Sequence, residues 1–354
     1  MLSLLIFTAV FTSAQADPSI KKIEDFEGLP QRIAFGSCSR SFKRQPVLNT
    51  IADKTPDLFV YLGDNIYADT RLQCIMRAKY RQLARKPEFK RLRATTPIVS
   101  TWDDHDYSGG NDAGAESRFK TKSEQIFLDF WEVPEESDRR KHPGVYGHYR
   151  FEADGRSLSL ILLDTRYFRG PLKKNTRKDI KGPNAQFRRK YQPDPDPEKT
   201  VLGKEQWAWL EERLREPADV RIIGTSIQFA HAYNGLESWN NFPLEKARLL
   251  SLIKKTQASG VIFISGDVHW GEISREPEGA GYPIYDVTSS GLTQVHDWSS
   301  SNKKRVGKSL KEVHFGIIEI DWSQENPEIS LQLIDVEGTV RREHTLLLDD
   351  LKAK

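Results

Sequence analysis

The chain has very little cysteine and no marked excess of either charge, and each absence excludes a class of protein. Only Cys38 and Cys74 occur in 354 residues. These two could pair, but one bridge cannot form the disulfide framework of a small secreted domain. The net charge is +3, from 53 basic and 50 acidic residues, which is too small to indicate a nucleic-acid scaffold. Basic runs such as residues 173–178 are typical of solvated loops.

Long apolar runs are also absent, since none after the N-terminus approaches the roughly 20 residues that span a bilayer. Residues 2–10 are apolar, and Ala14-Gln15-Ala16 has the small-x-small form that a signal peptidase cuts. We expect residues 1–16 to be a signal peptide and Asp17 the mature start, the alternative being a buried N-terminal helix. The mature protein would then be exported, to the periplasm, the extracellular space or the lumen of the endoplasmic reticulum or lysosome.

No internal repeat, low-complexity tract or linker rich in proline or glycine divides the chain. We therefore expect a lead-in over residues 17–30 and a single domain over residues 31–354, which is long enough to bury a substantial core. Residues 169–201 are rich in Lys, Arg, Pro and Asp. They form one long excursion that could be a lid or a disordered loop.

Apolar runs of strand length alternate with helical patterns along most of the chain. Strands are predicted at 32–36, 57–62, 96–101, 145–151, 158–163, 220–225 and 261–265, and helices at 47–54, 74–84, 122–131, 202–214 and 244–255. The C-terminal part is mostly extended, at 284–288, 315–321, 329–334 and 339–347. This order predicts an α/β layer structure, and the β-rich end indicates a second sheet.

Four of the predicted strands are followed at once by side chains that can bind metal ions. The segments are Gly36-Ser37-Cys38, Gly63-Asp64-Asn65-Ile66-Tyr67, Trp102-Asp103-Asp104-His105-Asp106 and Gly266-Asp267-Val268-His269-Trp270. Ligands of open α/β sheets bind beyond the carboxyl ends of strands, so we expect the four loops to converge at one edge. Gly63 and Gly266 would let the chain turn sharply there. Carboxylates packed so closely would repel one another, and metal ions relieve that repulsion.

Each segment alone has an ordinary interpretation. Aspartate after a strand is often a helix N-cap, and Cys38 could be a small buried residue. All four segments in chain order, each at a strand end, form a far more specific signal.

These segments resemble the motifs of a known family. Gly-Asp-Asn-x-x-Tyr, Trp-Asp-Asp-His-Asp and Gly-Asp-Val-His-Trp are similar to motifs of the PhoD-like (alkaline phosphatase D) branch of the calcineurin-like metallophosphoesterases. Gly36-Ser37-Cys38, Leu163-Asp-Thr-Arg166 and Thr288-Ser-Ser-Gly-Leu292 resemble further motifs of this branch. The resemblance, which spans about residues 32–295, implies an α/β fold with four layers, α/β/β/α, in which two mixed sheets are flanked by helices.

The resemblance also implies a binuclear metal site in which Asp64 bridges the two ions. The implied ligands are Cys38, Asp64, Tyr67, Asp104, Asp267 and His269. Thiolate and phenolate at the first ion suit Fe³⁺, with Zn²⁺ as the fallback, and oxygen ligands at the second suit Ca²⁺, Mg²⁺ or Mn²⁺. Two departures from the wider superfamily are expected. The first motif lacks Asp-x-His, whose place Cys38 takes, and the extra N-terminal β domain of many relatives is absent.

A hydroxide held between two cations is a strong nucleophile at neutral pH. The predicted reaction is in-line attack of this hydroxide on the phosphorus of a phosphate mono- or diester. His105 would protonate the leaving oxygen, oriented by Asp106 or Asp103.

Three further side chains are candidate substrate ligands, each with a structural alternative. Arg166 could grip a phosphate oxygen or form a salt bridge with Asp164 or another acid. Asn65 could contact the substrate or form the turn. His231 could replace a histidine of the superfamily or be a structural residue.

Other functions stay open at this point. A phosphodiesterase or phospholipase acting on a lipid or nucleotide diester would use the same metal core, and the walls of the pocket, expected at 107–120, 169–201 and 233–242, would decide. The aromatic residues that could line it or pack in the core are Tyr233, Trp239, Phe242 and Trp298. A secreted metal-binding protein without catalysis is a second alternative. A bimetal hydrolase of amides or lactones is a third alternative. Such enzymes usually use more histidines than the eight scattered histidines of this chain can bring together.

Overall fold

The computed structural model describes residues 20–110, 113–176, 190–277 and 279–353. The predicted signal peptide and mature start therefore lie outside the described residues, as does the middle of the 169–201 excursion. Within the described part of the chain, no helix has both the length and the apolar character needed to cross a membrane.

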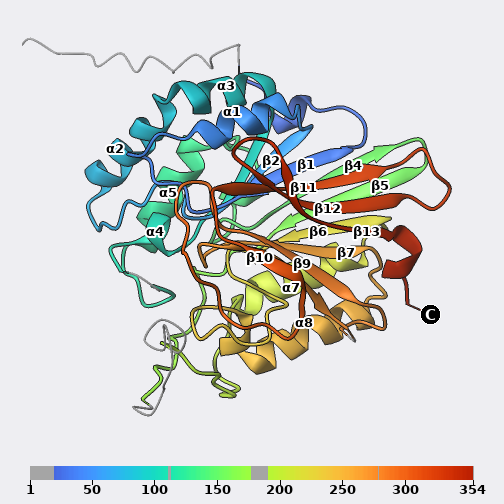
Figure 1. Cartoon of the computed structure of the whole chain (residues 1–354). Coiled ribbons are helices and arrows are strands. Elements are labelled where there is room, and N and C mark those ends of the chain that lie inside the picture. The colour runs from blue at the N-terminus through green and yellow to red at the C-terminus, as the bar shows by residue number, and fades with distance from the viewer. Residues whose placement is uncertain (1–19, 111–112, 177–189, 278, 354) are drawn as a thin grey trace, which may run out of the picture.

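The first of two mixed sheets joins the N-terminal strands to the C-terminal ones (Figure 1). Its strands are β1 (Arg32–Gly36), β2 (Leu58–Leu62), β3 (Ile98–Thr101), β11 (His314–Asp321), β12 (Glu328–Asp335) and β13 (Val340–Leu347). They lie in the order β13-β12-β11-β1-β2-β3. β1, β2 and β3 run parallel, and β11 pairs antiparallel with β1. The end of the chain thus completes the sheet that its beginning starts.

The second sheet is built from the middle of the chain. Its strands are β4 (Gly147–Ala153), β5 (Arg156–Leu162), β6 (Val220–Gly224), β7 (Val261–Ser265), β8 (Gly271–Glu276), β9 (Ile284–Ser289) and β10 (Arg305–Leu310). Their order is β10-β8-β9-β7-β6-β5-β4. β5, β6, β7 and β9 are parallel neighbours, whereas β4, β8 and β10 pair antiparallel.

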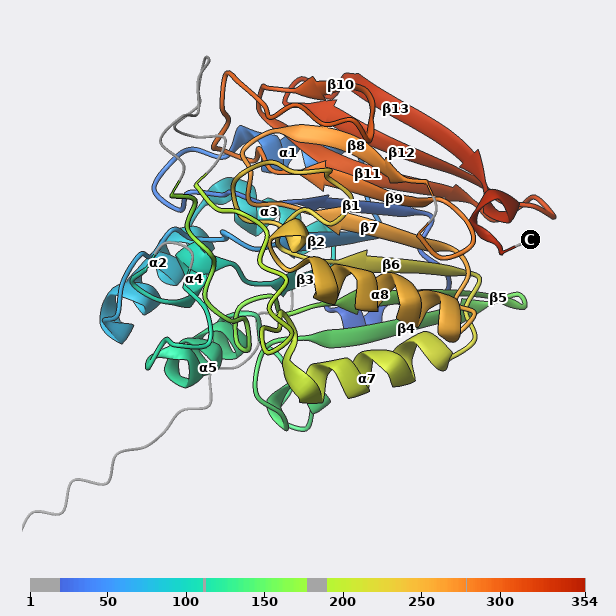
Figure 2. The same ribbon diagram turned by 90° about the horizontal axis from the view of Figure 1, so that it is seen from below.

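Helices cover the outer faces of both sheets (Figures 1 and 2). Those over the first sheet are α1 (Pro46–Asp53), α2 (Gln73–Ala84), α3 (Pro87–Thr95) and α5 (Lys120–Phe130), and those over the second are α7 (Gly203–Arg215) and α8 (Pro243–Lys255). The short helices are η1 (Ile23–Asp25), α4 (Asp104–Tyr107), η2 (Asp138–Arg140), η3 (Trp239–Asn241) and η4 (Leu348–Leu351).

Alternating side chains of β1 show how the layers are held together. Ile33 and Phe35 pack into a core cluster shared with the second sheet, whereas Ala34 packs into a cluster shared with α1, α2, α3 and α5. Because both faces are buried, the strand has an almost continuous apolar sequence. The predicted α/β/β/α architecture of two mixed sheets flanked by helices is confirmed.

The sequence did not reveal β8, β10, α3 or α4. β8 has little apolar character because its buried side chains include Glu272, which accepts a hydrogen bond from Gln228 at 2.7 Å. β10 is an edge strand with mostly exposed or half-buried residues. α3 buries only Phe89 and Leu92, too few residues to produce a helical pattern.

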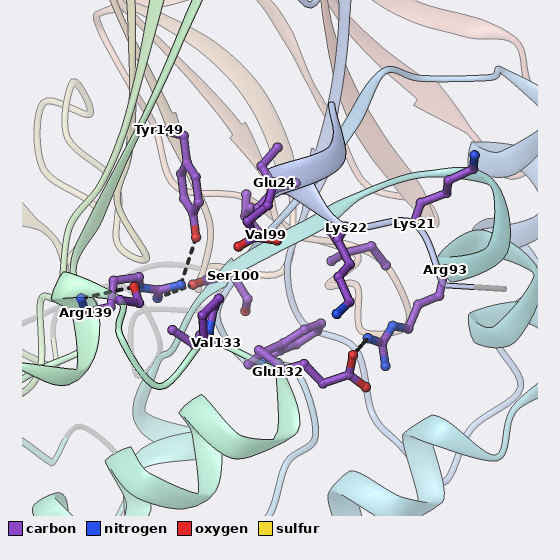
Figure 3. A pocket seen from close by; sticks show the side chains of 15 residues that line it. Lys21, Lys22, Glu24, Arg93, Val99, Ser100, Glu132, Val133, Arg139 and Tyr149 are labelled. Carbon is purple, nitrogen blue, oxygen red and sulfur yellow. Dashed lines mark hydrogen bonds and ion pairs between the residues drawn. The ribbon is translucent and has the colours of Figure 1, made fainter. Parts of the chain in front are cut away.

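The lead-in segment closes a small cavity of about 60 Å³ beside β3, away from the predicted site residues (Figure 3). The Arg139 side chain lies there and joins the edges of the two sheets. It donates to the Ser100 carbonyl oxygen of β3 at 2.9 Å and to the Tyr149 hydroxyl of β4 at 3.1 Å. Arg93 pairs with Glu132 at 3.2 Å. Arg139, Arg93 and Glu132 thus have partners within the protein.

Candidate metal centre

The four metal-capable loops meet where strands of both sheets end. Three follow the parallel strands β1, β2 and β3 of the first sheet, and the fourth follows β7 of the second. The loops therefore converge as predicted, but at the strand ends of two sheets rather than at the edge of one.

Donor atoms gather in three overlapping groups, each with its atoms within 4.8 Å of one another. The groups are Cys38, Asp64 and His269; Asp64, Asp104 and His105; and Asp103, Asp104 and Asp267. Asp64 and Asp104 each belong to two groups, while His269 and Asp267 lie in different ones. This distribution suits two neighbouring cations that share a carboxylate.

Tyr67 lies at the edge of the first group. Its hydroxyl is 2.9 Å from Nε2 of His269. The His105 ring stacks on the Tyr67 ring with centroids 4.1 Å apart, and the Arg40 guanidinium carbon lies over the same ring at 4.8 Å from its centroid. The Tyr67 ring therefore contacts both His105 and Arg40.

The backbone at the centre is strained. Ten non-glycine residues of the described chain have positive φ, and six of them belong to these loops: Cys38, Asp64, Tyr67, Asp69, Asp267 and His269. Such conformations are unfavourable for residues with a Cβ and tend to persist where the surroundings fix them, often at functional sites. Gly63, at φ +96°, could not be replaced without conflict, because an added Cβ would lie 2.6 Å from the Asp103 Cβ. Gly266 has a different role from the predicted turn, since it makes room for the Ser37 side chain.

The protein environment disfavours charge on the clustered acids. Burial, with Cys38 and Asp104 nearby, raises the pKa of Asp64 well above its ordinary value. Burial and the neighbouring Asp103 and Asp104 do the same to the pKa of Asp267. Oδ1 of Asp64 and Oδ2 of Asp103 are buried without a hydrogen-bond partner among the described residues. Bound cations would satisfy these oxygens and favour the ionised carboxylates.

The other donors are also suited to metal binding. Burial lowers the pKa of His269 to about 3, which leaves the neutral imidazole that binds metals. Burial raises the pKa of Cys38 to about 11, although hydrogen bonds from its neighbours oppose this, so a cation would be needed to hold the thiolate. Ser290 lies 3.0 Å from Cys38 Sγ and accepts a hydrogen bond from the His269 amide at 2.7 Å. The residues present therefore fit a binuclear site.

Asp69, which the sequence analysis missed, holds His105. Its carboxylate lies 2.5 Å from Nδ1 of His105. Burial opposes the charged imidazole, but the nearby Asp64 and Asp104 and the bond to Asp69 outweigh it and raise the pKa of His105 to about 10. The prediction that Asp106 or Asp103 orients His105 is wrong, although Asp69 stands only five residues after Asp64 in the same loop.

Asp106 instead supports the loop that carries Asp64. Its two carboxylate oxygens accept hydrogen bonds from the backbone amides of Asn65 and Ile66, both at 3.0 Å. The Asn65 side chain is buried and donates to the Thr101 carbonyl oxygen at 3.0 Å. These contacts favour the turn-forming interpretation of Asn65 over substrate contact.

Arg166 has no exposed surface and belongs to a buried ionic network. It donates to Asp103 at 2.5 Å and to Glu237 at 2.8 Å, and Glu237 also pairs with Arg169 at 3.0 Å. This placement favours the structural salt bridge over a grip on phosphate. The guanidinium partners are Asp103 and Glu237, while Asp164 accepts a hydrogen bond from the backbone amide of Arg166.

His231 is not among the residues that surround the donors. It is fully buried, and its Nε2 lies 3.6 Å from Glu272 on β8. Burial and the nearby Arg305 lower the pKa of His231 to about 3. The structure favours the alternative in which His231 is a structural residue.

A cavity of about 130 Å³ opens directly over the donors. Its lining consists of Asp104, His105, Lys190, Tyr191, Leu236, Glu237, Asp267, Val268, His269 and His296. Two of the predicted walls, 169–201 and 233–242, contribute to it, and none of the described residues of 107–120 does. Trp239 and Phe242 are buried in the core, whereas Trp298 stacks on His296 with ring centroids 4.9 Å apart. His296 is a further residue that the sequence analysis missed, because its ring reaches His269 (4.7 Å) only through the fold.

Cys74 lies outside this centre and is exposed. Both cysteines are free, so the possible pairing does not occur.

Two mixed sheets between helical layers, with metal-capable side chains where the strands end, define the fold class of the metallophosphoesterases. A family model described as "PhoD-like phosphatase" matches residues 33–284, and the chain belongs to this family.

The comparisons with individual proteins agree with this assignment. Alkaline phosphatase D of Bacillus subtilis (strain 168) is 25% identical over 279 residues, which are 67% of this chain and 45% of that protein. The chain thus spans less than half the length of this curated relative.

Solved structures show the same fold. The match to a structure of PhoD covers 91% of this chain and 72% of the PhoD chain, with a TM-score of 0.60 and 18% identity. The match to purple acid phosphatase PPD1 from yellow lupin (Lupinus luteus) seeds covers 92% of this chain and 55% of the lupin chain. Its TM-score is 0.61, at 15% identity.

Replacing Asp64 by asparagine should remove both metal ions, because Asp64 contributes to two donor groups. Cys38→Ala should lower the occupancy of one ion only. Elemental analysis of the purified variants measures both effects, and Cys74→Ala is the matched control, expected to keep the full metal content. An Asp64→Asn variant that retains two ions per chain would contradict the shared carboxylate.

Proposed function

We propose that this chain hydrolyses phosphate mono- or diesters in the cavity over the candidate metal centre, using two metal ions. The observation that carries the proposal is the sharing of Asp64 between two donor groups directly beneath a cavity that His105 also lines. Membership of the PhoD-like phosphatase family supports it. A structural metal site is usually saturated by protein ligands and needs no such opening.

The donor chemistry indicates which ions would be held. Cys38, Tyr67 and His269 offer sulfur, phenolate and imidazole, which suit Fe³⁺ or, as the fallback, Zn²⁺. Asp104 and Asp267 offer carboxylate oxygens, which suit Ca²⁺, Mg²⁺ or Mn²⁺. When bound, such a pair of ions supplies an activated water and neutralises charge on the phosphoryl oxygens.

His105 is proposed as the acid that protonates the leaving oxygen. It lines the cavity, and its bond to Asp69 fixes the ring so that Nε2 faces Asp104 at 4.0 Å, on the side of the donors. Asp69 is thus a positioning residue. The ordered imidazole would favour esters whose alcohols are poor leaving groups, because those depend most on proton donation.

Arg40 is proposed to bind a phosphoryl oxygen. Arg166 and Arg169 are fully buried and are neutralised by Asp103 and Glu237. Arg40 forms no ion pair among the described residues, and its Nε is buried without a hydrogen-bond partner. It lies against Tyr67, and its charge helps to lower the pKa of His269, for which burial is the main cause. A doubly charged monoester would gain more from this cation than a singly charged diester.

Export belongs to the same proposal. It is supported by the apolar run and the Ala14-Gln15-Ala16 sequence near the N-terminus. A purely metal-binding function and the hydrolysis of amides or lactones are not favoured by any contact of the centre.

The first experiment determines metals and activity on one purified sample. Nitrophenyl phosphate and its bis-ester are both offered, with and without chelator. We expect two metal ions per chain and hydrolysis that the chelator abolishes, because the reaction depends on the bound ions. The proposal would be refuted if complete removal of metal left hydrolysis unchanged. It would also be refuted if neither ester were hydrolysed after iron and calcium are added back.

His105→Ala should lower kcat by about 10² to 10⁴ on an alkyl phosphate, since proton donation contributes that much. The loss should be smaller on nitrophenyl phosphate, whose leaving group needs no proton, and the metal content should not change. Asp69→Asn should produce the same leaving-group dependence with a smaller loss. Equal losses on both esters would show that His105 is not the acid.

Arg40→Gln should raise KM for a monoester by about 10- to 100-fold, the loss expected for a charge-assisted hydrogen bond, with a smaller effect on the bis-ester. Arg40→Lys should recover part of the loss. Arg44→Gln, four residues along the same loop, is the matched control and should match the unmodified protein. Affinity for inorganic phosphate, measured by titration calorimetry, should fall in parallel with the rise in KM. Unchanged phosphate affinity in Arg40→Gln would exclude this role.

A further inference from the structure

Positive charge is concentrated in two segments beside the candidate metal centre. Residues 38–45 and 70–86 together contain nine lysines and arginines and no acidic residue, whereas the whole chain has a net charge of only +3. The rest of the molecule is therefore net acidic. A local excess of this size needs an explanation other than general solubility.

The two segments form one surface, which we call the α2 rim, consisting of residues 38–45 and 70–86. The Ser41 hydroxyl donates to the Gln82 side chain at 3.0 Å, and the Lys79 ammonium lies 5.3 Å from the centre of the Phe42 ring. Ile75, Lys79 and Gln82 follow helical spacing and so share one face of α2. The loop after β1 thus packs along this face.

Large apolar side chains are exposed on the α2 rim. Phe42 is 52% exposed, Leu72 58% and Ile75 40%, and they are three of the seven large hydrophobic side chains that are exposed in the described chain. Their gathering on one short helix and its neighbouring loop is the arrangement that marks an interaction surface, in contrast to scattered single residues.

Six of the nine cations of the α2 rim are exposed to solvent. Arg44, Arg81 and Arg85 are exposed, and none of them forms an ion pair within the described part of the chain. Arg77 alone has an acidic partner, Asp129, at 3.7 Å. The surface therefore offers unneutralised positive charge together with apolar side chains.

We infer that the α2 rim binds the surface of an anionic phospholipid bilayer. Cations attract acidic head groups, and apolar side chains that enter the interfacial region add binding energy. Both features are present on α2 and the loop that packs on it. A nucleic acid would use the same cations but would have no use for exposed Leu72 and Ile75, so the apolar side chains favour the membrane.

The α2 rim adjoins the opening of the metal centre. α2 begins four residues after Asp69, which holds His105, and Arg40 of the rim lies against Tyr67. In both views α2 and α4, the helix that carries His105, lie at the same end of the molecule, and the C-terminus lies at the other (Figures 1 and 2). Docking would present the cavity to phosphate esters in lipid head groups. This last step rests on the proposed function, whereas the binding itself does not.

The test is co-sedimentation of the whole protein with vesicles of phosphatidylcholine alone and with vesicles that also contain phosphatidylserine. The protein should bind the anionic vesicles and not the neutral ones. The variant Arg44→Gln, Arg81→Gln and Arg85→Gln should bind at least about tenfold more weakly, because three charges are lost from the surface. Phe42→Ser with Ile75→Ser should also weaken binding, which a purely electrostatic contact would not show.

A matched control removes three exposed lysines elsewhere, with Lys254→Gln, Lys303→Gln and Lys308→Gln. It should bind like the unmodified protein. Equal weakening in both triple variants, absence of binding to anionic vesicles, or binding to duplex DNA in preference to vesicles would overturn the inference. Both triple variants should hydrolyse nitrophenyl phosphate at the unmodified rate. Failure of the proposed function would appear as loss of that hydrolysis in the unmodified protein and leaves the vesicle result to stand by itself.

Discussion

Repulsion between buried carboxylates is the constraint on which the rest of this structure depends. Asp64, Asp103 and Asp104 are buried, and they lie close to one another and to the half-buried Asp267. Such a cluster cannot stay ionised unless cations compensate it. Part of the compensation is built in, since Arg166 pairs with Asp103 and, through Glu237, is linked to Arg169. The remaining negative charge lies at oxygen atoms of Asp64 and Asp103 that have no hydrogen-bond partner among the described residues, and metal ions would compensate it.

The fold maintains this unfavourable cluster with rigid supports. Three of the loops follow parallel strands that are packed on both faces, and the fourth follows a strand of the second sheet. Side chains such as Asp106 fix the loops from behind through backbone amides. With the loops held in this way, left-handed conformations at Cys38, Asp64 and His269 can be maintained.

The layers and the metal-capable loops could be predicted because both depend on residues that are close together in the sequence. A buried strand is an apolar run, and the candidate ligands follow it directly. The contacts of the supporting residues could not be predicted, because Glu237 and His296 reach the site only by packing. Ser290 lies in the Thr288-Ser-Ser-Gly-Leu292 motif, but its contacts with Cys38 and His269 also depend on the fold. The polar character of β8 hid a strand whose buried glutamate is satisfied by Gln228 and Arg305. Asp69 lies in the same loop as Asp64, but Asp103 and Asp106 are nearer to His105 in the sequence.

The ring of Tyr67 contacts two groups for which different tasks are proposed, since it stacks on His105 and lies against Arg40. A tyrosine that binds an ion through its oxygen cannot tilt freely, so the ion would also fix the spacing between the proton donor and the guanidinium. The identity of the metal would then influence geometry as well as charge. Exchange of one ion for another of different radius would then shift both the proton donor and the guanidinium relative to the substrate. This shift would occur even where the new ion is an equally strong Lewis acid.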